Sequence, residues 1–106
     1  MKTRTQNPTP DLQKIQTSCD ICGVDSTSVV AMEECGELIQ CVAKELRGKS
    51  DKSHMEEEIG DVLISVSNLI YIYDLDEERI QRWIDFKQNR QLNRIGKPLT
   101  IKEAVK

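Results

Sequence analysis

Apolar residues recur along most of the chain at the three- and four-residue spacing of an α-helix. The pattern is interrupted by glycine at positions 23, 48 and 96, and by an aspartate-rich turn near residue 75. Glycine commonly follows the end of a helix, and aspartate commonly precedes the start of one. The pattern therefore predicts an all-α protein with four helices, at about residues 10–22, 26–47, 53–73 and 75–95.

The helix starts are predicted from residues that cap free backbone N–H groups. Thr9 followed by Pro10 is typical of a helix start, with threonine as the N-cap and proline at the first helical position. Ser53 and Glu56 have the spacing of a capping box, and Asp76 is the expected N-cap of the last helix. Each predicted helix except the second therefore begins at a definite signal.

The composition supports one small domain. The chain has 106 residues, of which 38% are hydrophobic and only 4% aromatic, so its core must be aliphatic. A chain of this length is close to the size at which a partner subunit helps to complete a core. We expect a flexible N-terminal arm at residues 1–8, a helical domain at 9–98 and a C-terminal tail at 99–106.

Charge and hydropathy limit the possible partners and location. A formal net charge of −3 argues against general nucleic-acid binding, which usually requires a basic surplus. The longest nearly apolar stretch, residues 62–73, is shorter than the roughly 20 residues of a transmembrane helix. The N-terminus lacks the apolar run of a signal peptide. We therefore expect a cytoplasmic protein, not bound to membranes, whose four cysteines are reduced.

The second predicted helix has an apolar face with acidic residues along its edge. At helical spacing this face contains Met32, Cys35, Leu38, Ile39, Val42 and Leu46. Glu34 lies at the edge of the face, and Glu37 lies one turn further along the same side.

The third predicted helix is apolar on nearly all sides apart from one polar stripe. The stripe contains Glu58, Asp61, Ser65 and Asn68, with His54 at its N-terminal end. A helix that is apolar on most sides is usually buried. The stripe is therefore expected to face a groove or an interface, where carboxylates are costly unless they are paired or bind a metal.

Two interpretations of these acidic residues remain open at this point. Carboxylates at positions i and i+3 on two helices suit a hard cation such as Mg²⁺, which prefers oxygen ligands. Alternatively, they are ordinary solvated helix faces, balanced by Lys44, Lys49 and Lys52.

The two acidic segments resemble the paired motifs of a known enzyme family. "EECGE" at 33–37 and "EEIGD" at 57–61 are similar to the E-E-x-x-E and E-E-x-x-D motifs of the MazG-like all-α nucleoside triphosphate pyrophosphohydrolases. "FKQNRQLNR" at 86–94 is similar to the K-x-N-R segment that closes the family's domain. The resemblance covers residues 12–97, and the two acidic motifs occur in the family's order and spacing.

The resemblance implies Mg²⁺-dependent hydrolysis of nucleoside triphosphates to the monophosphate and pyrophosphate, as in nucleotide-pool housecleaning. Mn²⁺ is the alternative ion. Glu34, Glu37, Glu58 and Asp61 would be the metal ligands, and either Glu34 or Glu37 would be the general base. The roles of Glu33 and Glu57, which fill the first positions of the two motifs, stay open.

The resemblance also implies roles outside the metal ligands. Lys87 and Arg90 would hold the phosphate chain, and Asn68 would contact phosphate or sugar. For all three, a structural role on the helix or inside the bundle is the alternative. The family forms dimers or tetramers, so a four-helix bundle completed by oligomerisation is expected.

The sequence also allows other functions and other roles for some residues. Phosphoribosyl-ATP is an alternative substrate within the enzyme class, and a non-catalytic helical adaptor is the alternative outside it. Cys19 and Cys22 have half the pattern of a zinc site, but no second Cys-x-x-Cys exists. His54 is interpreted as a surface residue at a helix end, with a phosphate contact as the alternative. Base preference, the choice between dimer and tetramer and the number of metal ions have no local signature.

Overall fold

The computed structural model describes residues 7–49 and 51–96, and three α-helices lie within them. α1 covers Leu12–Leu46, α2 covers Lys52–Ile72 and α3 covers Glu77–Arg94. These ranges contain no strand, which confirms the all-α class. The predicted C-terminal tail, 99–106, and positions 1–6 of the predicted arm lie outside the described residues.

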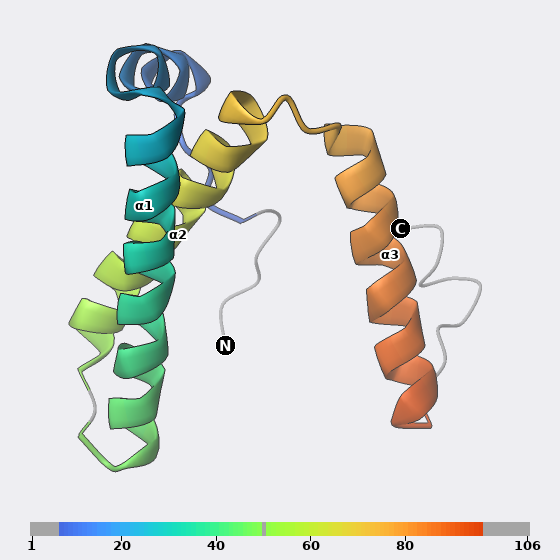
Figure 1. Ribbon diagram of the computed structural model, residues 1–106. Helices are drawn as coiled ribbons and strands as arrows, with labels where there is room; N and C mark the ends of the chain where they lie inside the picture. Colours follow the sequence, from blue (N-terminus) through green and yellow to red (C-terminus); the bar gives the residue numbers. More distant parts are fainter. Residues whose placement is uncertain (1–6, 50, 97–106) are drawn as a thin grey trace. The chain divides into compact units, whose positions relative to one another are not determined.

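The first two predicted helices form a single kinked helix, so the described chain has three helices where four were predicted. The kink is at Gly23, whose φ of 84° and ψ of 174° are not helical. Residues with a side chain rarely adopt a positive φ, and glycine does so at little cost. The glycine therefore redirects the helix, and helical geometry resumes directly after it. Figure 1 shows the sharp turn between the two segments of α1.

Each of the three helices begins at an aspartate. Asp11, Asp51 and Asp76 each accept a hydrogen bond of 3.0 Å from the backbone N–H three residues further on. The prediction for Asp76 is confirmed, whereas the predictions of Thr9 and Ser53 as N-caps are wrong. Asp11 lies close to Thr9, and Asp51 lies close to Ser53. Each aspartate accepts a hydrogen bond from a free backbone N–H of its helix, and its charge interacts favourably with the positive end of the helix.

α1 and α2 form a hairpin in which the two helices lie side by side (Figure 1). α1 ends at the predicted place, because Gly48 has a φ of 79° and leads the chain out of the helix. The chain divides into one unit that ends at Leu75 and another that begins at Asp76. α3 belongs to the second unit and is described by itself; none of its residues is buried.

The packed face of the hairpin is polar to an unusual degree. Its buried residues are Ile15, Cys19, Thr27, Ala31 and Cys41 on α1, and Glu58 and Ser65 on α2. The polar stripe of α2 is thus turned toward α1, as predicted. Ala31 and Cys41 are small, so the two helices can approach closely along this line.

The apolar face predicted for residues 32–46 is not the face that packs on α2. Met32 is 67% exposed, Ile39 70% and Leu46 84%. Cys35 is exposed as well, and of the predicted face only Leu38 is half-buried. Leu38 lies on a neighbouring line with Ala31, Glu34 and Cys41, and this line occupies the packed position. The outer face of the hairpin is therefore largely apolar.

None of the helices in the described ranges combines the length and the hydropathy that crossing a membrane requires.

Candidate metal centre

Carboxylates from both helices of the hairpin converge at one place. Glu34 and Glu37 of α1 and Glu58 of α2 each offer an oxygen atom, and the three oxygens lie within 4.8 Å of one another. Positions three apart share one face of a helix, which explains the pair on α1. The hairpin then brings the polar stripe of α2 opposite this pair. The structure thus unites three of the four predicted metal ligands in one group.

Asp61, the fourth predicted ligand, is adjacent to this group. Asp61 is half-buried like Glu34, and it is close enough to raise the pKa of Glu34. When both are ionised they repel, and a cation between them removes the repulsion.

Two oxygens of the cluster are buried without a hydrogen-bond partner among residues 7–49 and 51–96. They are Oε2 of Glu34 and Oε2 of Glu58, and the Glu58 residue is only 3% exposed. Buried polar atoms are nearly always hydrogen-bonded, and buried charges are paired or coordinate a metal. The alternative interpretation as a solvated surface acid is therefore wrong for Glu58, whereas Glu34 is half-buried and Glu37 is exposed.

The protonation of the cluster reflects this environment. Burial raises the pKa of Glu34 above its usual value, and the contact with Asp61 and the negative charges around it raise it further. Burial also raises the pKa of Glu58; the charge of Glu37 adds to this effect, and His54 opposes it. Ionisation of these groups is thus unfavourable without a compensating positive charge, which a divalent cation would supply.

His54 is a neighbour of this cluster that sequence analysis did not assign to it. Its Nε2 lies 3.7 Å from Oε1 of Glu58, one helical turn further along α2. His54, Glu57 and Glu58 also form a group of possible ligand atoms within 4.8 Å of one another. The spacing of His54 and Glu58 by four residues was the signal in the sequence that could have indicated this pairing.

Asn68 lies on the same stripe but contacts a different part of the chain. Its Oδ1 accepts a hydrogen bond of 3.4 Å from the thiol of Cys19, in the segment of α1 before the kink. It follows Asp61 by seven residues, which is roughly 10 Å along a helix. In the part of the chain that the structure describes, no group of possible metal ligands includes Cys19 or Cys22.

Lys87 and Arg90 lie on α3, in the second unit. The Lys87 ammonium is 6.0 Å from the centre of the Trp83 ring, and the Arg90 guanidinium carbon is 5.5 Å from that of Phe86. These distances are typical of cation–π contacts, which direct both cations along one face of the helix. The two predicted phosphate ligands therefore share a face of α3 with its aromatic residues.

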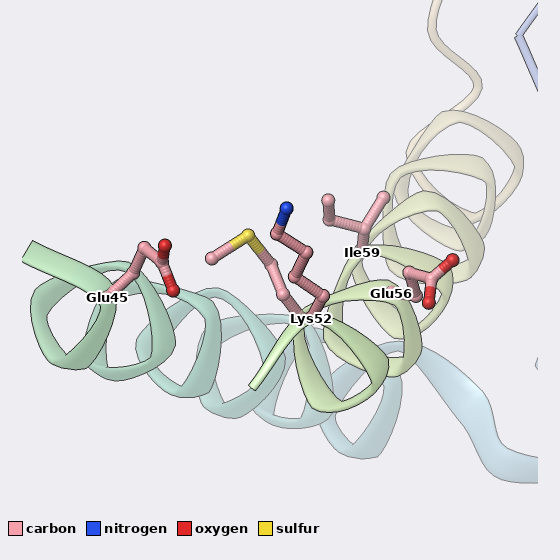
Figure 2. Close-up of a pocket in the computed structure, with 5 residues that line it drawn as sticks. Glu45, Lys52, Glu56 and Ile59 are labelled. Carbon is pink, nitrogen blue, oxygen red and sulfur yellow. The ribbon is translucent and has the colours of Figure 1, made fainter. Parts of the chain in front are cut away.

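A separate groove of about 390 Å³ lies near the end of the hairpin where α2 begins (Figure 2). It is lined by Glu45, Lys52, Met55, Glu56 and Ile59. Glu56 is two residues from Glu58, which is about 200° around a helix, so it belongs to this groove and not to the carboxylate cluster.

The residues that the structure describes are helical and bring paired carboxylates together on a hairpin, which defines the protein as an α-helical candidate for metal binding. Comparison with known families identifies the particular one. The family model described as the MazG nucleotide pyrophosphohydrolase domain matches residues 23–91, which include both acidic motifs and the K-x-N-R segment. The chain therefore belongs to the MazG nucleotide pyrophosphohydrolase family. No curated protein and no solved structure matches it.

Proposed function

We propose that this protein hydrolyses nucleoside or deoxynucleoside triphosphates to the monophosphate and pyrophosphate, with Mg²⁺ bound at the carboxylate cluster. The observation that carries the proposal is the convergence of Glu34, Glu37, Glu58 and Asp61, with two buried oxygens that no protein group satisfies. Oxygen ligands from carboxylates suit Mg²⁺, with Mn²⁺ as the alternative ion. Membership of the family supports the reaction class.

The residues of the cluster have separate tasks in this proposal. Glu37, Glu58 and Asp61 hold the cation, which when bound neutralises phosphate oxygens and acidifies water. Glu34 also contributes a ligand oxygen. Either Glu34 or Glu37 acts as the general base in this proposal. The base accepts the proton of the water that attacks phosphorus, and pyrophosphate leaves.

Groups outside the cluster would position the substrate. Lys87 and Arg90 bind the phosphate chain in this proposal, Arg90 through two parallel N–H donors. Asn68 lies roughly 10 Å along α2 from Asp61 and contacts phosphate or sugar in this proposal. The reaction acts on the nucleotide pool, and the cytoplasm is the proposed location.

The same proposal includes a homodimer or homotetramer. The outer face of the hairpin contains an apolar groove of about 460 Å³ that Met32, Cys35, Ile39, Leu69 and Tyr73 help to line. Exposed apolar surface of this kind marks an interaction site. A second copy of the chain would cover it and complete the helical bundle.

The test is to incubate the protein with a panel of dNTPs and NTPs, with Mg²⁺ and with EDTA, and to quantify monophosphate and pyrophosphate. We expect equal amounts of both products with Mg²⁺ and none with EDTA. Release of inorganic phosphate and a diphosphate would contradict the proposed bond cleavage. No turnover by a folded protein on any of these substrates would favour phosphoribosyl-ATP or the adaptor function.

A further inference from the structure

The group formed by His54, Glu57 and Glu58 is a second place where a cation could bind. Its three ligand atoms lie within 4.8 Å of one another, as do those of the group formed by Glu34, Glu37 and Glu58. Glu58 belongs to both groups, so the two groups share one carboxylate. The proposed reaction uses the group that spans both helices and assigns no task to the group within α2.

Glu58 has ligand capacity that the described residues do not use. The residue is 3% exposed, its Oε2 is buried without a hydrogen-bond partner among the described residues, and its Oε1 is 3.7 Å from Nε2 of His54, which is longer than a hydrogen bond. A carboxylate has two oxygens and can therefore bridge two cations. Such bridging is common where two metal ions are about 3.5–4 Å apart.

The donor atoms differ between the two groups. Carboxylate oxygens alone suit Mg²⁺ and Mn²⁺, whereas an imidazole nitrogen beside carboxylates favours ions such as Zn²⁺, Fe²⁺ and Ni²⁺. We propose that His54, Glu57 and Glu58 form a second cation site that takes a transition-metal ion in preference to Mg²⁺.

The first turn of α2 leaves the imidazole available for this task. Asp51 caps the backbone N–H of His54, so the side chain of His54 is not needed to start the helix. That side chain is 45% exposed, whereas the Glu58 side chain is 4% exposed. An ion could therefore enter from solvent past His54 and Glu57 and reach the buried carboxylate.

The protein offers a direct probe, because His54 is its single histidine. The experiment is an NMR titration of the full chain with diamagnetic Zn²⁺, without nucleotide, in the presence of excess Mg²⁺. Binding of Zn²⁺ to the imidazole nitrogen should give a large shift of the ring ¹⁵N signals of His54, whereas an ion held only by carboxylates should leave them nearly unchanged. Unshifted ring ¹⁵N signals after one equivalent of bound Zn²⁺ would overturn the proposal.

Variants separate the second site from the first. Counting bound Mn²⁺ by electron paramagnetic resonance without Mg²⁺, we expect two ions on the unmodified chain and one on His54→Gln or Glu57→Gln. The affinity for the lost ion should fall at least about 10-fold. Glu56→Gln, next in sequence to Glu57, should retain both ions. A single ion on the unmodified chain, or unchanged binding in His54→Gln, would contradict the second site.

This inference does not depend on the proposed hydrolysis. Binding is measured without a substrate, so a protein that binds two Mn²⁺ ions but hydrolyses no triphosphate would retain the second site and lose the proposed function. Conversely, hydrolysis by a protein with one ion would retain the function and refute the site.

Discussion

In a typical small domain the inner face of a helix is apolar and the outer face is polar, whereas the α1–α2 hairpin shows the reverse. The inner face buries Glu58 and Ser65 and keeps Glu34 half-buried, whereas Ile39 and Leu46 on the outer face are mostly exposed. A chain that folded only for its own stability would bury the aliphatic side chains and leave the acids in water. Here the acids occupy the positions between the helices.

The two faces are therefore explained by two different partners. The carboxylates are kept close together at a cost in repulsion and desolvation, which is reasonable if a cation binds between them. The apolar face would be costly in an isolated chain and is reasonable if a second copy covers it. The following changes, from the largest expected effect to the smallest, test each half of this explanation.

Removing one carboxylate from the inner face should have the largest effect. Glu34→Gln and Glu58→Gln keep the size of the side chain but remove a charged ligand, so pyrophosphate release should fall by more than about 100-fold. Steady-state hydrolysis at saturating Mg²⁺ is the measurement.

Glu56→Gln is the matched control for these variants, because Glu56 lines the separate groove shown in Figure 2. It should retain activity within about 2-fold, as is usual for a surface change away from the site. Equal losses of activity in Glu56→Gln and Glu58→Gln would show that the total negative charge matters, and not the membership of Glu58 in the converging cluster.

A charge on the outer face should disrupt the oligomer. Ile39→Glu would place a carboxylate in the apolar groove, and burying it against a second copy would be unfavourable. Sedimentation velocity should show an oligomer for the unmodified chain and for Gln40→Glu, but a monomer for Ile39→Glu. A monomeric unmodified chain would contradict the explanation of this face.

Removing the cations of α3 should weaken substrate binding. Lys87→Gln and Arg90→Gln should each raise KM for the triphosphate about 10-fold, with a smaller change in kcat, because charge-assisted bonds to phosphate are lost. Arg82→Gln, on the same helix, is the control and should leave KM unchanged. If KM is unchanged in all three variants, Lys87 and Arg90 only contact the aromatic rings.

The smallest expected effect is on the pH dependence of stability without metal. The pKa of Glu34 and of Glu58 is raised in the folded protein, so folding favours their protonated forms. This contribution is fully present below the pKa of an unfolded glutamate, about 4.3. It is lost as the pH rises through the raised values.

Melting in EDTA across this pH range is the measurement. The fall in Tm with rising pH should be smaller in Glu58→Gln, which has no carboxyl group to ionise at that position. An equal slope in Glu58→Gln and in the unmodified chain would show that Glu58 ionises normally.

Several features of the molecule were predictable from local sequence. Periodicity and glycine positions gave the helix ends near Gly48 and Gly96, and the i, i+3 spacing gave the shared faces of the acidic pairs. The stripe on α2 was correctly predicted to face inward, because a helix that is apolar on its other sides leaves few alternatives. The family resemblance from the two acidic motifs is also confirmed.

Other features depend on which face of one helix meets another, and local sequence does not determine that. Met32, Cys35 and Ile39 have the spacing of a core face but lie outside, because the neighbouring line with Ala31 and Cys41 allows closer packing. The N-caps at Asp11 and Asp51 were missed because several polar residues compete at each helix start. The pairing of His54 with Glu58 was missed because His54 was interpreted as a surface residue.

Binding of Mg²⁺ by the inner face is the central claim, and a thermal titration of the protein with Mg²⁺ tests it most directly. A ligand that binds only the folded state stabilises it by RT ln(1 + [L]/Kd), so Tm continues to rise with the logarithm of the ligand concentration above Kd. We predict such a rise of Tm with Mg²⁺ concentration for the unmodified chain and for Glu56→Gln, but a constant Tm for Glu58→Gln. A Tm of the unmodified chain that does not change with Mg²⁺ would contradict the claim.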